Sequence, residues 1–141
     1  MGIIDAHGHL GRWKRDWNED LLLPELLSGI LDRTGVAAIL VSNLSGIDTR
    51  DHSAGGEPWL RQREANLELL EWCRSDPRLL PLAVCQPGLA GADEIEAQLS
   101  LYKFFGLKFH PFHLNLDAND HAFDPFMEAA AAARLPAVFH A

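Results

Sequence analysis

The chain has 141 residues, of which 48% are hydrophobic, so it is long enough and apolar enough to fold around a real core. Its formal net charge is −8 and its basic residues are scattered, which excludes the basic patch that nucleic acids and anionic membranes require. No apolar run approaches the roughly 20 residues of a membrane-spanning helix, and the N-terminus lacks the pattern of a secretory signal. We therefore expect a cytoplasmic protein that acts on a small molecule.

The chain contains two cysteines, Cys73 and Cys85. They form no Cys-x-x-Cys motif, and a single pair does not make a disulfide framework. We expect both to be packed as reduced thiols.

The first motif is Ile-Ile-Asp-Ala-His-Gly-His-Leu-Gly at residues 3–11. If residues 3–9 form a strand, successive side chains alternate between its two faces, so Asp5, His7 and His9 share one face. Two imidazoles then point to one place, and neutral imidazole is a good ligand for zinc and similar ions. The alternative is a pair of exposed histidines in a loop, because His-x-His is a common tripeptide.

Predicted strands and helices alternate along the rest of the chain. Residues 11–23 are polar and are expected to form a loop, whereas 36–43 is a continuous apolar run typical of a strand buried on both faces. A helix is predicted at 58–77, where apolar residues recur at three- and four-residue spacing, including Leu60, Leu67, Leu70 and Trp72. The other expected helices are 24–35, 91–106 and 124–135, and the other expected strands are 78–87, 107–111 and 136–141.

This alternation predicts a parallel α/β architecture with right-handed crossovers. An open doubly wound sheet fits the length, but its ligand site usually follows a glycine-rich turn, where this chain has His-Gly-His. A (β/α)8 TIM-barrel type, truncated to about the first four β/α units plus strand five, fits better. Barrel enzymes place their chemistry at the carboxyl ends of the strands, where this chain has His7, His9, Asn43, Gln86, His110 and His140.

Lys108 and His110 are two residues apart on the predicted fourth strand, so they share a face, opposite Leu107 and Phe109. A lysine inside a barrel must be paired, associated with a metal or modified, and a surface lysine at a frayed strand end is an equal alternative. His140 alone would be a structural residue. Together with the histidines of the first strand, it indicates a site.

Three blocks of the sequence, at 3–11, 63–88 and 106–141, resemble the metal-dependent amidohydrolase superfamily. The resemblance is strongest to the amidohydrolase-related branch with the aminocarboxymuconate-semialdehyde decarboxylase-like enzymes. The third block, with Gly-Leu-Lys-Phe-His-Pro and Leu-Pro-Ala-Val-Phe-His, is the most specific. The first block is shared with TatD-like nucleases and PHP-type phosphoesterases.

The resemblance implies that His7, His9 and His140 are ligands of a divalent metal ion, for which zinc is favoured. Lys108 is not counted as a ligand, because the site of this branch is usually mononuclear; with His110 it is expected to contact a substrate carboxylate. The implied activity is that of a metal-dependent hydrolase, in which the ion activates water. Nonoxidative decarboxylation or hydration, as in relatives, is the alternative.

The family also needs a sixth-strand histidine and an eighth-strand aspartate, which would lie beyond Ala141. We therefore expect residues 1–141 to be a single amidohydrolase-related domain that is incomplete at its C-terminus, inactive alone, with its catalytic residues unknown. An unpaired strand at the sheet edge also predicts self-association into a homo-oligomer.

Two other interpretations stay open. One is a non-catalytic half-barrel that binds metal weakly or pairs with a partner. The other is a phosphoesterase of the PHP or TatD type, although Asp48, Asp51 and Glu57 form no evident ligand pattern. The remaining histidines, which are His52, His113 and His121, are expected to be exposed to solvent.

Overall fold

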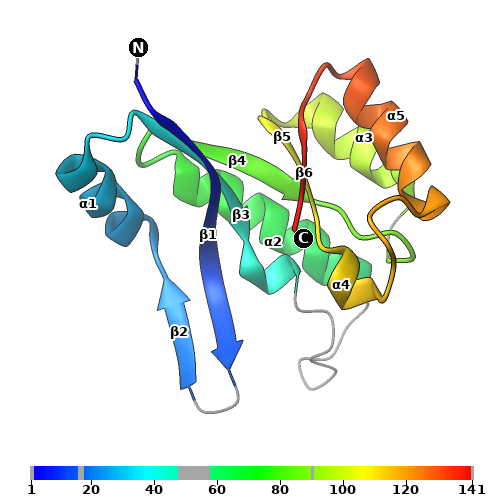
Figure 1. Cartoon of the computed structure of the whole chain (residues 1–141), viewed down its shortest axis with the longest axis horizontal. Coiled ribbons are helices and arrows are strands. Elements are labelled where there is room, and N and C mark those ends of the chain that lie inside the picture. The colour runs from blue at the N-terminus through cyan, green and yellow to red at the C-terminus, as the bar shows by residue number, and fades with distance from the viewer. Residues whose placement is uncertain (1, 16–17, 48–57, 90, 141) are drawn as a thin grey trace.

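The computed structural model describes residues 2–15, 18–47, 58–89 and 91–140. Within these ranges the strands form one sheet in the order β2-β1-β3-β4-β5-β6 (Figure 1). All neighbours from β1 to β6 pair in parallel, and β2 alone is antiparallel. The strands are β1 (Ile4–Arg15), β2 (Asn18–Leu22), β3 (Ala38–Asn43), β4 (Leu79–Val84), β5 (Gly106–Phe109) and β6 (Ala137–Phe139).

Helices connect the parallel strands, as the alternation of the sequence predicts. The first helix begins at Pro24, whose missing N–H is not needed there, and ends at Gly35, which takes a left-handed φ of 69° and donates to the carbonyl of Leu31. The helices are α1 (Pro24–Thr34), α2 (Pro58–Cys73), α3 (Ala92–Leu101), α4 (Pro111–Leu114) and α5 (Asp124–Ala132), with short 3-10 turns at Leu44–Gly46 and His121–Phe123.

The core between the sheet and the helices determines which way β5 faces. Leu107 and Phe109 are fully buried in a cluster with Ile95 of α3 and Phe126 of α5. Because side chains alternate along a strand, this packing directs Lys108 to the opposite, concave face of the sheet. The helix-facing core therefore fixes the direction of the polar residues of β5.

The helix predicted at 58–77 forms as α2, but the face that it buries is not the one predicted from its apolar residues. Asn66 donates to the carbonyl of Val84 at 3.1 Å and accepts from its N–H at 2.9 Å. These two hydrogen bonds connect α2 to the end of β4 and so determine which face of the helix packs against the sheet. The fully buried residues are Gln62, Ala65, Asn66, Leu69 and Cys73, whereas Leu60, Leu67, Leu70 and Trp72 are only partly buried.

The loop predicted at 11–23 is wrong, because β1 continues to Arg15 and forms a hairpin with β2. Leu10 still lies opposite Asn43 of β3, but the next residue, Gly11, lies opposite Leu22 of β2. Polar composition is a poor guide here, since an antiparallel edge pair needs only one covered face.

Gly11 is required where β1 changes partners. Its φ is +92°, and a Cβ at this position would lie 2.1 Å from Oδ1 of Asn43. We expect Gly11→Ala to lower the free energy of unfolding by about 2–3 kcal/mol, measured by urea denaturation, because backbone strain and a clash add together. Gly35→Ala is the control, since φ is also positive there but no atom lies within 4 Å. Equal losses in the two variants would contradict this prediction.

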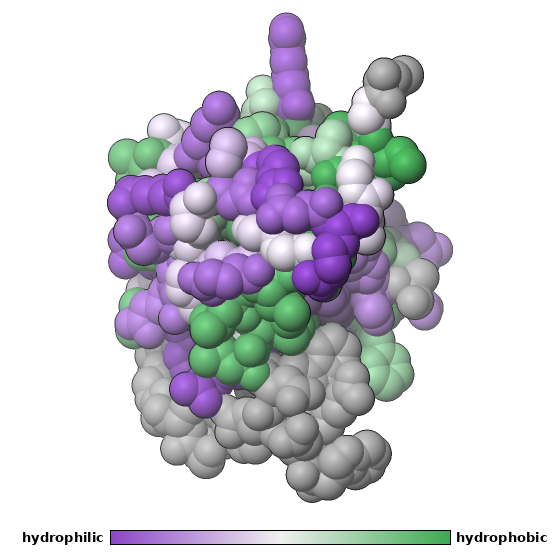
Figure 2. Space-filling view, turned by 90° about the vertical axis from the view of Figure 1, so that its left-hand side faces the viewer, coloured by the Kyte–Doolittle hydropathy of each residue, from purple (hydrophilic) through white to green (hydrophobic). Residues whose placement is uncertain are grey.

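The face of the molecule that carries α1 is largely hydrophilic, with a hydrophobic area near its centre and smaller hydrophobic areas at its edges (Figure 2). Within the described ranges, no helix is long and apolar enough to cross a membrane. Ile3 and Ile4 at the start of the chain are 68% and 60% exposed. Self-association and a cytoplasmic location stay predictions. The exposed large apolar residues of β2, α1 and the turn between them are Leu21, Leu23, Leu26 and Ile30.

Candidate metal centre

The two histidines of the first motif lie on β1 and point to one place. Their Nε2 atoms are 2.9 Å apart. A bulge between Asp5 and Gly8 adds one residue to β1, and the carboxylate of Asp5 accepts the N–H of His7 at 3.0 Å. The bulge interrupts the alternation of side chains between the two faces of the strand at Asp5, so the carboxylate of Asp5 binds the backbone of its own strand. His7 and His9 converge as their spacing predicts.

His140 approaches this pair from the opposite edge of the sheet. It follows β6, and its backbone N–H donates to the carbonyl of Phe109 at 3.0 Å. Although three strands separate β1 from β6 in the sheet, the rings of His7 and His140 have centroids only 5.4 Å apart. One ligand atom from each of His7, His9 and His140 lies within 4.8 Å of the others. The curvature of the sheet therefore brings the three predicted ligands together.

Lys108 is inside, not on the surface. Its side chain is 0% exposed, and its ammonium donates to Nε2 of His7 at 3.2 Å. Burial lowers the pKa of Lys108 to about 8, because the charged form loses hydration. The interpretation of this residue as an exposed lysine at a frayed strand end is wrong.

His110 lies directly behind His140. It is 3% exposed, and its ring stacks on that of His140 with centroids 4.5 Å apart and an interplanar angle of 17°. Both ring nitrogens are buried and lack a hydrogen-bond partner. Burial, followed by the positive charge of Lys108, lowers the pKa of His110 to about 2, so the ring is neutral. A buried imidazole with two unsatisfied nitrogens is suited to receive a polar ligand.

The other three histidines have different fates. His113, expected to be exposed, is partly buried in α4 with its ring centroid 5.5 Å from that of His110. This expectation is wrong because residues 111–114 form a helical turn that packs the ring inward. His121 is exposed, as predicted, and contacts Asp124 at 2.8 Å. His52 lies outside the described residues, as do Asp48, Asp51 and Glu57.

Ser42 is the site residue that sequence reasoning missed. Its Oγ lies 2.9 Å from Nδ1 of His9, and the two residues are partners in the β1–β3 register. Such a contact holds the ring in place and leaves Nε2 for a ligand. The serine precedes Asn43 at the end of an apolar strand, which is the signal that could have revealed it.

Asn43 and Gln86, the two amide residues predicted at strand ends, form hydrogen bonds with the backbone of neighbouring segments. Asn43 donates to the carbonyl of Ala65 and accepts from the N–H of Ser45. The amide of Gln86 donates to the carbonyls of Gly46 and Ile47. Both side chains therefore support the rim of the site instead of lining it.

The electrostatic surroundings keep the paired imidazoles neutral. Burial is the largest cause that lowers the pKa of His9, to about 4, and the charges of His7 and Lys108 add to it. The pKa of His7 is also lowered, first by burial and then by Lys108, while Asp5 opposes the shift. Neutral imidazole is the form that binds metals. Three imidazoles at this spacing could hold a divalent ion, and they suit zinc, iron, nickel or copper.

Residues 4–141 match the amidohydrolase family. The chain belongs to this family. No curated protein matches its sequence closely enough to count as a relative. The resemblance of the three sequence blocks to the amidohydrolase superfamily is thereby confirmed.

Solved structures share the fold of this chain. The 2,6-dihydroxybenzoate decarboxylase from Rhizobium has a TM-score of 0.73 at 17% identity, covering 99% of this chain and 49% of its own. A probable 2-pyrone-4,6-dicarboxylic acid hydrolase from Acinetobacter baumannii, with citric acid bound, has a TM-score of 0.63 at 20% identity, covering 100% and 50%. The 5-carboxyvanillate decarboxylase from Novosphingobium aromaticivorans, with bound manganese and a nitrobenzoic acid, has a TM-score of 0.69 at 21% identity, covering 85% and 35%.

These likenesses establish the fold of the amidohydrolase chain. The solved structures are TIM barrels, and the chain spans about half of their length or less. The curled, mostly parallel sheet with its helices therefore corresponds to part of a barrel, as predicted. The open doubly wound sheet is excluded.

Proposed function

We propose that this protein is a metal-dependent hydrolase that acts on a small molecule bearing a carboxylate. His7, His9 and His140 would hold one divalent ion, which we take to be zinc. The observation that carries the proposal is the convergence of these three imidazoles on one point at the concave face of the sheet, two from β1 and one that follows β6, more than 130 residues later in the sequence.

The chain's own residues prepare this site for an ion. Ser42 orients His9, and the lowered pKa values of His7 and His9 keep both rings neutral at neutral pH, with one nitrogen of each free to bind an ion. An ion bound there would supply Lewis acidity, which polarises the scissile group and activates water. The donor set, three neutral imidazoles with one oriented by a hydroxyl, fits such an ion.

Lys108 and His110 would bind the substrate. When Nε2 of His7 serves as a ligand it no longer accepts from Lys108, so the buried ammonium needs another anionic or acceptor group. A substrate carboxylate satisfies that need. The neutral ring of His110 donates one further hydrogen bond to it, because one of its nitrogens carries a proton and neither has a partner in the protein.

The proposed function is tested by product analysis on the native protein. The substrates are lactones, esters and amides that also carry a free carboxylate. Their hydrolysis is measured before chelation, after chelation and after zinc is restored. We expect hydrolysis that chelation abolishes and zinc restores. Substrates without the free carboxylate should react at least about tenfold more slowly.

Other outcomes contradict the proposal in distinct ways. Release of carbon dioxide from aromatic carboxylates, without hydrolysis, would favour the decarboxylase alternative. Hydrolysis that is insensitive to chelation would remove the role of the ion. Metal binding without turnover of any substrate would favour the non-catalytic half-barrel.

A further inference from the structure

The ring of His140 is held in a different way from the ring of His9. Ser42 contacts Nδ1 of His9, whereas within the described ranges no hydrogen bond reaches the ring nitrogens of His140. His140 follows β6, a strand of three partly buried residues at the edge of the sheet. Its backbone N–H is bound by the carbonyl of Phe109, but a backbone hydrogen bond does not select the side-chain rotamer. Another contact must therefore fix the plane of this ring.

His110 presents a flat surface to the ring of His140. The two rings are nearly parallel, with an interplanar angle of 17° and centroids 4.5 Å apart. His7, in contrast, meets His9 and His140 edge to face, at 4.7 and 5.4 Å between centroids. A stacked contact constrains the plane of a ring, because rotation out of that plane would drive its edge into the neighbouring face. The stacked pair is thus the contact that can set the orientation of His140.

His110 is firmly placed in the fold. It is 3% exposed, and its carbonyl accepts the N–H of His113 at 3.2 Å, where α4 begins. The next residue, Pro111, is buried at the first position of α4, and a proline restricts the backbone of the residue that precedes it. The ring of His110 therefore serves as a fixed support for a ring at the edge of the sheet.

Stacking leaves the nitrogens of His110 available for another role. The contact with His140 uses a face of the ring, whereas hydrogen bonds to an imidazole lie in the plane of the ring. Both nitrogens of His110 are buried and have no hydrogen-bond partner in the protein. Support of His140 and contact with a substrate therefore use different parts of the same side chain.

We propose that His110 is a positioning residue for the metal centre: the face of its ring sets the plane of His140 and so directs a nitrogen of His140 to the ion that His7 and His9 also hold. This inference rests on the proposed function, because it takes His140 as a ligand. It differs from the substrate role of His110, since a substrate contact needs the ring nitrogens and positioning needs only a flat ring. Removal of a contact that orients a ligand typically weakens metal binding by about 10–100-fold.

Zinc affinity, measured by competition with a chromogenic chelator, separates these two properties of the side chain. We expect His110→Leu to bind zinc at least about tenfold more weakly than the wild-type chain. His110→Phe keeps a flat ring without nitrogens, and its affinity should stay within about threefold of the wild-type value. Circular dichroism and thermal unfolding establish that each variant is folded. Wild-type affinity in His110→Leu would overturn the proposal, and so would equal losses in the two variants.

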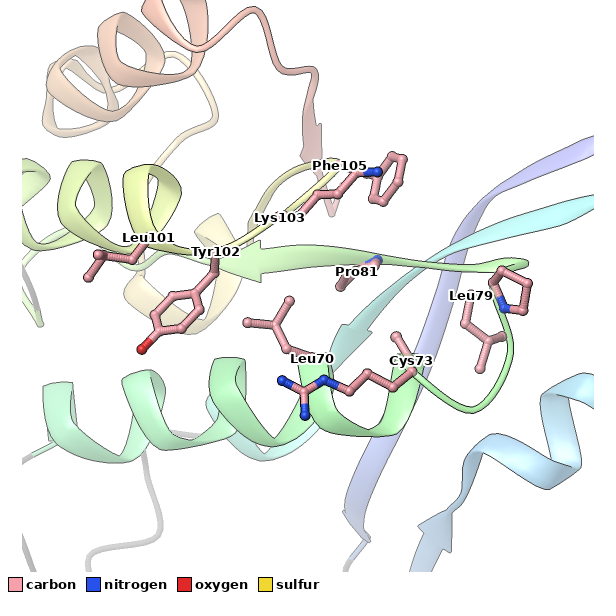
Figure 3. A pocket seen from close by; sticks show the side chains of 10 residues that line it. Leu70, Cys73, Leu79, Pro81, Leu101, Tyr102, Lys103 and Phe105 are labelled. Carbon is pink, nitrogen blue, oxygen red and sulfur yellow. The ribbon is translucent and has the colours of Figure 1, made fainter.

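The control removes an aromatic ring at the other end of the strands. Tyr102 is partly buried against the same core cluster as Phe109, but it lines a groove between α2 and the segment that follows α3 (Figure 3). This groove is also lined by Leu79 at the start of β4 and by Phe105 just before β5, far from the carboxyl ends where the histidines lie. Tyr102→Leu should leave zinc affinity unchanged. A loss equal to that of His110→Leu would show that zinc affinity follows general stability, and would overturn the proposal.

A second measurement needs no metal. In the metal-free chain, stacking places the ring protons of His140 against the face of His110, whose ring current shifts their NMR resonances upfield. The shift should persist in His110→Phe and disappear in His110→Leu, with the resonances assigned by their loss in His140→Asn. A shift that His110→Leu retains would overturn the proposal. A wild-type chain that binds no zinc would instead contradict the proposed hydrolase function, and the resonances would still decide whether His110 fixes the ring of His140.

Discussion

The His7→Ala, His9→Ala double variant is expected to lose the divalent metal that we propose for the wild-type chain. Only His140 of the three converging imidazoles would remain, and a single neutral imidazole does not retain an ion through purification. Elemental analysis of protein purified without chelator should show about one ion per wild-type chain and essentially none in the variant. The same measurement identifies the ion and so tests the choice of zinc.

Two further variants make this experiment specific. His121→Ala removes an exposed histidine whose ring nitrogen contacts Asp124, and it should leave the metal content unchanged. Ser42→Ala removes the hydroxyl that lies against Nδ1 of His9, and it should weaken metal affinity by about 10–100-fold. Metal that persists in the double variant would contradict the assignment of these ligands, and so would a wild-type chain that binds no metal.

The second large effect is acid destabilisation of the metal-free protein. The folded state holds His9 and His110 neutral, with pKa values near 4 and 2, whereas the unfolded chain protonates them below about pH 6.5. The unfolded state therefore binds more protons, and the free energy of unfolding falls as the pH drops from 6.5. At pH 5, His110 alone should cost about 2 kcal/mol of stability, and His9 acts in the same direction.

Urea denaturation between pH 7 and pH 4.5, with chelator present, measures this slope. In His110→Phe, which keeps a buried ring but does not titrate, the slope below about pH 5.5 should decrease by about 1.3 kcal/mol per pH unit. His121→Asn is the control with the opposite sign, because the hydrogen bond and charge of Asp124 raise the pKa of His121. Its contribution is present at low pH and is lost as the pH rises. A slope that His110→Phe does not change would show that His110 is not held neutral.

Much of this architecture was readable from local patterns. Pro24 and Gly35 delimited the first helix, and the apolar run at 36–43 identified a strand between two parallel neighbours. The spacing of His7 and His9 placed both imidazoles on one face. These features depend on interactions between residues close in sequence, and for that reason a period or a terminal signal could reveal them.

Other features depended on contacts between distant segments. The change of partner at Gly11 arises because β1 is longer than β3 and its extension pairs with β2. The buried face of α2 follows Asn66, which satisfies the backbone of Val84, and hydrophobic periodicity carries no information about such a hydrogen bond. The same holds for Ser42, whose role exists only because the register places it opposite His9.

The sequence by itself determined the kind of fold and the residue types of the candidate site. The tertiary structure decided the site's electrostatic character: whether Lys108 faces solvent or His7, and whether His110 is charged or neutral. The physical reason is that protonation depends on burial and on neighbouring charges. Both are set by the curvature of a sheet that brings His7 of β1 close to His140, which follows β6.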